Sequence, residues 1–113
     1  MIIASLKRKT NILPILLACM EEKIPLGMKQ IQEQLSRLQG WEIEEGKLEK
    51  EFRFPSFKAA SEFVSKLANI SEEQGHHPDI YWWYDKIKIV LFTHTIKSLS
   101  LDDFILAGKI DKI

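Results

Sequence analysis

The sequence predicts one α+β domain, a four-stranded antiparallel sheet with helices packed on one face, in the order α-β-β-α-β-β-α. Three observations support this fold class. Apolar residues recur at helical spacing in three segments, and apolar or aromatic residues form four short runs typical of strands. The four runs fall into two pairs, and a short polar stretch suited to a tight turn separates the members of each pair. Strands joined by tight turns are antiparallel, so we predict two hairpins in one sheet.

Length and composition limit the class of protein. A chain of 113 residues is long enough to bury one core without disulfides. Its 16 basic and 16 acidic residues balance without a basic arm, which argues against direct nucleic-acid binding. The single cysteine, Cys19, excludes an intramolecular disulfide and fits a reducing compartment, so we predict a cytoplasmic protein. No apolar run is long enough to span a bilayer, so we expect no membrane insertion.

Residues 1–22 form an N-terminal extension whose role the sequence leaves open. Lys7-Arg8-Lys9 and the apolar stretch after it imitate a short signal peptide, and Leu16-Leu17-Ala18-Cys19 imitates a lipoprotein cleavage site. The apolar stretch is short and contains Pro14, which favours an interrupted extra helix or a dispensable extension. We therefore expect the domain itself to occupy residues 23–113.

The first predicted helix begins at Pro25 and ends at Gly40. Two strands follow around the hairpin signal Glu45-Gly46, and Lys50 interrupts the second strand, so one face there is expected to be wet. Trp41 either offers a stacking platform for a flat ligand or packs in the core, and the core is the favoured interpretation. The apolar positions are Met28, Ile31, Leu35 and Leu38 in the helix and Ile43, Leu48, Phe52 and Phe54 in the strands.

The second predicted helix begins after Ser56, which is placed to cap it, and ends before Gly75. Its apolar stripe is wide enough to pack on a sheet and also to meet a second subunit. Glu72 and Glu73 fall in its last turn, where the helix dipole does not favour acidic side chains. For Glu72 this weakly indicates a role in orienting a histidine or contacting a substrate, whereas solvated surface is the simpler reading of Glu73. The stripe consists of Phe57, Ala60, Phe63, Val64, Leu67, Ile70 and Ser71.

Residues 72–103 contain all three histidines of the chain, His76, His77 and His94. Imidazole has an ordinary pKa of about 6.5 and can give and take protons near neutrality, so proton transfer is the first chemistry to consider. Pro78 pushes His77 towards an extended conformation, in which neighbouring side chains point to opposite sides. One of His76 and His77 should therefore face a pocket while the other braces it.

The aromatic run 80–84 and the apolar run 87–92 predict the second hairpin. Asp85-Lys86 fits its two-residue loop, because Asp tolerates the positive φ that such loops require. The returning strand would bring His94 beside the other two histidines.

Ser100 precedes the last predicted helix, which reaches about Lys112. Ser100 and Asp103 have the spacing of a capping box with Asp in place of Glu. Capping is enough to explain Asp103, so we do not assign it to catalysis.

A metal site and a covalent nucleophile are the alternatives to acid/base chemistry. Adjacent His76 and His77 in an extended segment cannot readily aim both rings at one ion, and no His-x-His or His-x₃-His spacing is present. Cys19 lies in the extension, and no serine sits in a nucleophile-elbow motif. We therefore expect no metal, and structural histidines are the remaining alternative for any one of the three.

These residues resemble the pattern of the pterin-4a-carbinolamine dehydratase family over about residues 25–113. Gly75 stands where many members have Asp or Asn, and Ser98-Leu99 where many have Gly-Leu. Both departures affect loops that should shape the pocket, but neither removes an imidazole. The resemblance rests on Glu72, His76-His77-Pro78, Tyr84, His94 and Asp103, and outside this core on Gly40-Trp41, Phe52, Phe54 and Leu106-Ala107.

The resemblance implies the same order of elements, a homodimer or homotetramer, and a pterin substrate. It implies a dehydratase that removes water from 4a-hydroxytetrahydropterin to give quinonoid dihydropterin. The reaction recycles the cofactor of aromatic amino-acid hydroxylases, which makes such a hydroxylase a candidate partner. An acid and a base are enough for this step, so we expect no cofactor.

The resemblance also implies roles for individual residues. His76 and His94 would share the acid/base work, His77 would mainly hold the pterin, and Glu72 would assist. The rival interpretation is a binding module, either a dimerisation partner of a transcription factor or an assembly factor. The intact histidine set favours the enzyme, and a dual role stays open. The predicted pterin-binding positions are Glu72, Gly75, His76, His77, Phe92, Thr93, His94 and Thr95.

Overall fold

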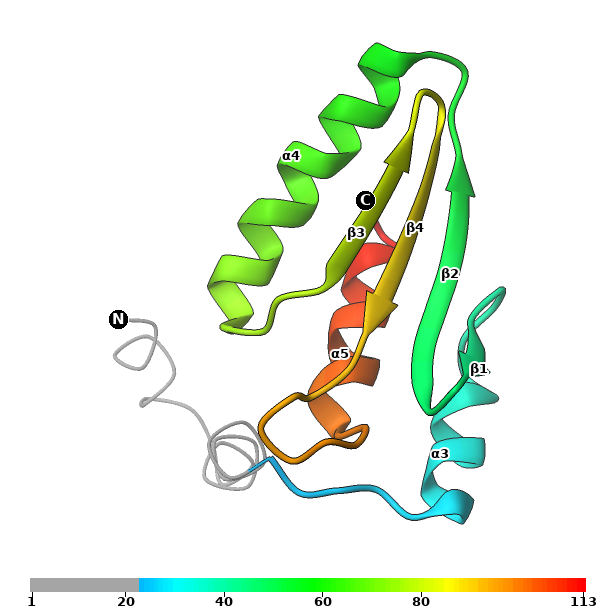
Figure 1. The fold of residues 1–113 in the computed structure, drawn as a ribbon, viewed down its shortest axis with the longest axis vertical. Coiled ribbons are helices and arrows are strands. Elements are labelled where there is room, and N and C mark those ends of the chain that lie inside the picture. Colours follow the sequence, from blue (N-terminus) through cyan, green and yellow to red (C-terminus); the bar gives the residue numbers. More distant parts are fainter. Residues whose placement is uncertain (1–22) are drawn as a thin grey trace.

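The computed structural model describes residues 23–113, which form helices and strands in the predicted order. All strands belong to one antiparallel sheet with spatial order β1-β2-β4-β3. In Figure 1, α4 runs beside the edge strand β3, and α5 passes behind the strands. The predicted fold class is therefore confirmed. The elements are α3 (Met28–Leu35), β1 (Glu42–Glu44), β2 (Lys47–Arg53), α4 (Phe57–Gln74), β3 (Asp79–Trp83), β4 (Lys86–Leu91) and α5 (Leu101–Ile110).

The register of the strands gives the sheet one apolar face and one charged face. On the charged face, ion pairs join β2 to β4, with Lys86 Nζ 3.7 Å from Glu51 Oε2 and Lys88 Nζ 3.9 Å from Glu49 Oε1. The apolar face lies under α4 and α5 and forms the core with them. The core residues are Leu48, Ile87, Ile89 and Leu91 from the sheet, Ala60, Phe63 and Leu67 from α4, and Phe104, Leu106, Ala107 and Ile110 from α5.

Trp41 belongs to this core, which confirms the favoured interpretation of that residue. Only 5% of its surface is exposed, and its Nε1 donates a hydrogen bond to Asp111 Oδ2 at 2.9 Å. Lys50 lies on the same face of the sheet, since it pairs with Ile89, and its Nζ is 2.9 Å from Asp111 Oδ1. Lys50 therefore does not mark a solvent-exposed face of β2, because its ammonium group reaches an acid at the edge of the core. The solvent-exposed face of the strand is the one opposite Lys50.

The ends of the two longer helices follow the predicted signals. Ser56 Oγ accepts a hydrogen bond from the Ala59 amide at 3.0 Å and caps α4. Gly75 ends α4 in the left-handed region with φ +73°. Ser100 and Asp103 form the capping box at the start of α5. These signals are local in sequence, and all three are confirmed.

The second hairpin turns one residue earlier than predicted, at Tyr84-Asp85, because Trp83 pairs with Lys86. Tyr84 carries the positive φ of +31°, and Asp85 does not. A loop at Asp85-Lys86 would instead place Tyr84 opposite Ile87 and Trp82 opposite Ile89, which slides β3 by two positions along β4 without changing the face of any side chain. The actual register keeps Trp82 opposite Ile87, which is fully buried in the core.

The outer helices are shorter than predicted. α3 ends at Leu35, and the chain continues in turns to Gly40, whereas α5 ends at Ile110 rather than near Lys112. Met28 does not share the buried face of α3, since 78% of it is exposed. Figure 1 places α3 at the end of the sheet near β1, where only the later apolar residues reach the core.

The predictions for the N-terminal extension, including the signal-like and lipoprotein-like patterns, fall outside the described residues. Among residues 23–113, no helix is both long and apolar enough to cross a membrane.

Candidate active site

The three histidines line one pocket of about 230 Å³. His76 and His77 reach it from the junction between α4 and β3, and His94 reaches it from the segment after β4. The structure thus brings together every predicted histidine. The lining residues are Lys23, Gly75, His76, His77, Phe92, Thr93, His94 and Thr95.

The end of α4 positions the first two histidines. The amides of Gly75 and His76 both donate to the Ser71 carbonyl, at 2.9 and 3.1 Å, which closes the helix and fixes where the next segment starts. A Cβ added to Gly75 would meet no atom within 4 Å, so the position selects glycine for its φ rather than for lack of space. Asp and Asn also tolerate this conformation, so the departure from the family pattern at Gly75 preserves the backbone.

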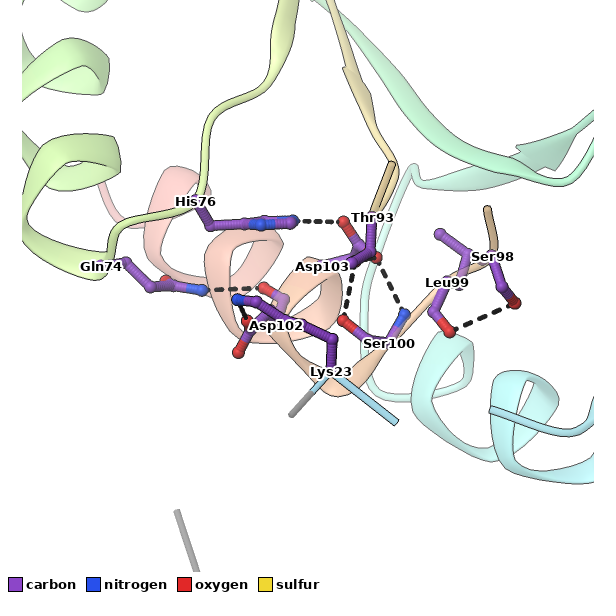
Figure 2. Close-up of polar contacts among 9 residues, drawn as sticks. All are labelled: Lys23, Gln74, His76, Thr93, Ser98, Leu99, Ser100, Asp102 and Asp103. Atoms are coloured by element: carbon purple, nitrogen blue, oxygen red, sulfur yellow. Dashed lines mark hydrogen bonds and ion pairs between the residues drawn. The ribbon is translucent and has the colours of Figure 1, made fainter. Parts of the chain in front are cut away.

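A buried carboxylate holds the His76 ring in place. Only 7% of His76 is exposed, and its Nε2 lies 2.6 Å from Asp103 Oδ1. Figure 2 shows the His76 ring pointing towards this carboxylate. Asp103 is fully buried, and its Oδ2 accepts hydrogen bonds from Thr93 Oγ1 at 2.8 Å and from the Ser100 amide at 2.9 Å. Thr93 gives its only proton to Asp103, so Ser100 Oγ donates to Thr93 Oγ1 at 2.8 Å.

This network sets the protonation pattern of the His76 ring. With the carboxylate as acceptor, Nε2 carries a proton, and Nδ1 is the ring nitrogen left with a free lone pair. A buried, oriented imidazole with one free nitrogen can act as a base and then as an acid. Asp103 was predicted only as a cap, and the structure shows that the same carboxylate also orients His76.

Asp103 is the site residue that sequence reasoning missed. It lies 27 positions after His76, and a local spacing rule such as the capping box cannot predict a partner at that distance. Its presence in the family pattern was the one available signal.

His77 has different surroundings from its neighbour, as expected in an extended segment, but both line the pocket, whereas only one was predicted to face it. Its side chain is 61% exposed, and its Nε2 lies 2.6 Å from Glu72 Oε2 in the last turn of α4. Both partners are solvated, so the pair contributes little to stability and mainly orients the ring. The structure thus places Glu72 against a histidine, while Glu73 is exposed.

His94 lies in a turn after β4, which brings it beside the other two histidines as predicted. The Thr93 amide donates to the Ser98 carbonyl at 3.0 Å and closes residues 94–97 into a short loop. The His94 ring packs edge-on against Phe92 with 5.3 Å between ring centroids. The left-handed residue of the loop is Lys97, at φ +50°, so the family departure at Ser98 does not fall on the strained position.

Two imidazoles therefore approach the pocket from different segments, one buried beside a carboxylate and one exposed on a loop. Within residues 23–113, no three His, Cys, Asp or Glu side chains group as metal ligands would. Two imidazoles that reach one pocket from different segments can serve as the acid and the base in the addition or removal of water.

Residues 24–113 match the family model described as pterin 4 alpha carbinolamine dehydratase. The chain belongs to the pterin-4a-carbinolamine dehydratase family. Among similar family members is a protein of Rubrobacter xylanophilus, provisionally named pterin-4-alpha-carbinolamine dehydratase, with 38% identity over 90 residues, 79% of this chain and 84% of the relative. A protein of Trichormus variabilis with the same provisional name is 43% identical over 88 residues, which cover 78% and 95% of the two chains.

Solved structures that are similar to this chain have other described roles. The transcriptional coactivator/pterin dehydratase of Brucella melitensis superposes with a TM-score of 0.76 at 25% identity, covering 79% of this chain and 97% of the other. A pterin dehydratase-like protein identified as a RuBisCO assembly factor in the alpha-carboxysome has a TM-score of 0.54 at 27% identity, covering 64% and 83%. Membership in the dehydratase family alone therefore does not establish whether this chain is a catalyst or a binding module.

Proposed function

We propose that the protein is a 4a-hydroxytetrahydropterin dehydratase that releases water and quinonoid dihydropterin, and so recycles the cofactor of aromatic amino-acid hydroxylases. The observation that carries the proposal is the buried pair of His76 and Asp103 in the same pocket as His94. Acid/base catalysis requires an imidazole oriented in a pocket in this way, whereas binding of a partner chain does not.

The reaction breaks the bond between C4a and its hydroxyl and removes the proton on N5. The hydroxyl leaves as water once an acid protonates it, and a base takes the N5 proton. In our proposal His76, through Nδ1, and His94 divide these two proton transfers, and Asp103 holds His76 in the tautomer that keeps Nδ1 free. His77, held by Glu72, contacts the pterin ring.

Backbone groups complete the proposed binding site. Residues 75–77 leave a helix end and residues 92–95 follow a strand, and both stretches line the pocket. The flat 2-amino-4-oxo ring of a pterin carries donors and acceptors along its edge, which such peptide groups can match. We propose that Gly75, Phe92, Thr93 and Thr95 act in this way.

The setting of the enzyme is also a proposal. A lone cysteine fits the cytoplasm. An edge strand rich in exposed aromatic residues fits a homodimer or homotetramer. An aromatic amino-acid hydroxylase is the partner that would supply the substrate.

A binding module is the second candidate, and one feature favours it. Strand β3 lies at the edge of the sheet, and large exposed side chains continue along it into the turn. Such an edge can accept another strand or chain. The exposed residues are Ile80, Tyr81, Trp82, Trp83 and Tyr84.

The two candidates separate in one experiment. The loss of 4a-hydroxytetrahydropterin is followed by stopped-flow absorbance with purified protein, with buffer alone, and with a variant lacking both His76 and His94. We expect the protein to accelerate the reaction well above buffer and the double variant to lose most of that effect. No acceleration by the folded wild-type protein would refute the dehydratase and favour the binding module.

A further inference from the structure

A second buried acid lies beside the proposed active site. Asp102 is fully buried next to Asp103, and Lys23 Nζ donates a hydrogen bond to its Oδ2, as Figure 2 shows. Gln74, at the end of α4, donates from Nε2 to the backbone carbonyl of Asp102 at 2.9 Å. These contacts tie the segment before α3, the end of α4 and the start of α5 together.

Lys23 also lines the pocket of the three histidines, and its side chain remains 20% exposed. Its backbone is in the left-handed region at φ +54°, which is unfavourable for a residue with a side chain. Just after it, the Leu26 amide donates to the Leu99 carbonyl at 3.0 Å and holds the segment against the loop that precedes α5. Lys23 thus combines an unfavourable backbone conformation, a buried counter-ion and a place in the lining of this pocket.

The ammonium group has hydrogen-bonding capacity left for a ligand. It carries three N–H donors, and within the described part of the chain Asp102 is its only hydrogen-bond partner. A cation with free donors at the edge of a pocket binds an oxygen acceptor of the ligand. The histidines must reach the substituents of C4a, and the carbon next to C4a in a pterin carries the 4-oxo group.

We propose that Lys23 contacts the substrate by donating a hydrogen bond to the 4-oxo group of the pterin, and that Asp102 is a positioning residue that holds Lys23. This inference rests on the proposed dehydratase function, since it names the part of the same substrate that Lys23 recognises. It assigns a role to a pair that capping and acid/base chemistry leave unused. It also predicts that the pocket selects 4-oxopteridines over 4-aminopteridines, whose amino group would place a donor against the ammonium.

The test compares the binding of two ligands that differ at this position, 7,8-dihydrobiopterin and its 2,4-diamino analogue, by titration calorimetry. Wild-type protein should prefer the 4-oxo ligand. Lys23→Met should weaken binding of the 4-oxo ligand about 10- to 100-fold, because it removes a hydrogen bond from a charged donor, and should leave the analogue little changed. Lys23→Arg keeps the charge and should restore part of the preference.

Two further variants control for stability. Lys50 is a matched control, because it also pairs with an acid, at 2.9 Å from Asp111, is 21% exposed, and lies outside the pocket. Lys50→Met should change thermal stability without changing the ligand preference. Lys23→Met leaves Asp102 buried without its cation, so the double variant Lys23→Met/Asp102→Asn repeats the measurement with both charges removed.

The possible results distinguish failure of the Lys23 contact from failure of the dehydratase proposal. If Lys23→Met and the double variant keep the wild-type preference, or lose affinity for both ligands equally, the contact with the 4-oxo group is refuted. If wild-type protein shows a Lys23-dependent preference but no turnover, this inference stands and the dehydratase proposal fails. If wild-type protein binds neither ligand, the contact with the 4-oxo group is refuted, and the turnover assay alone decides the dehydratase proposal.

Discussion

Replacing Asp103 by asparagine tests the centre of the proposed mechanism. The carboxylate accepts three hydrogen bonds, from His76 Nε2, Thr93 Oγ1 and the Ser100 amide. An asparagine that keeps its oxygen on the side of Thr93 and Ser100 must turn its NH₂ group towards His76. Nε2 would then have to accept a hydrogen bond, the ring proton would move to Nδ1, and the free lone pair would be lost.

The structure gives an expected magnitude for Asp103→Asn. Loss of a positioned acid or base lowers the rate about 10²- to 10⁴-fold, which equals about 3–5 kcal/mol of transition-state stabilisation. The cap survives in weaker form, since a neutral oxygen replaces a charged one, and the free energy of unfolding should fall by about 1–3 kcal/mol. We therefore expect a folded protein with a large loss in kcat and little change in KM.

The assay is single-turnover loss of 4a-hydroxytetrahydropterin, together with thermal unfolding by circular dichroism. Asp111→Asn is the matched control. Asp111 follows the other end of α5 and accepts hydrogen bonds from Trp41 Nε1 and Lys50 Nζ, both at 2.9 Å. It should lose stability and keep its kcat. A folded Asp103→Asn protein with kcat within about threefold of wild type would show that the carboxylate only caps the helix, because removal of a working base has a much larger effect.

Four further predictions follow from the site and the fold. His76→Ala and His94→Ala should each lower kcat about 10²- to 10⁴-fold, with opposite preference for the two C4a epimers, because the two imidazoles approach from different segments; equal effects on both epimers would argue against this division. His77→Ala should raise KM and leave kcat nearly unchanged in steady-state kinetics, since an exposed ring contributes uniform binding; a large fall in kcat instead would contradict that role. Light scattering at micromolar concentration should show a dimer or tetramer with β3 and α4 at the interface, and a monomer would count against it. A chain that starts at Met20 should retain wild-type activity and melting temperature, because every pocket residue follows it; a substantial loss of either would give the extension a role.

The sequence predicted the features whose causes are local. Ser56, Gly75 and Ser100 mark helix ends through bonds to residues a few positions away, and all three act as expected. The family pattern placed the histidines in one pocket.

Features that depend on tertiary register were predicted less well. The position of the second hairpin loop depends on how β3 and β4 pair along their length, and the strong turn preference of Asp85 indicated the wrong pair of residues. The dual role of Asp103 and the approach of Lys23 to the pocket both require segments that are far apart in sequence to meet. No spacing rule predicts such contacts, because they exist only once α4 and α5 have packed on the sheet.

The open edge of β3 has a consequence for handling the protein. Its outer backbone groups have no partner strand among the described residues, and the aromatic side chains beside them are exposed. A flat, apolar strand edge of this kind templates the addition of further strands. If this edge lies in the proposed subunit interface, a mutation that separates the chains without covering it should therefore yield precipitate rather than a well-behaved monomer. Any attempt to isolate single chains should place a lysine on the strand, at Tyr81 for example, since a charge there blocks edge-to-edge pairing.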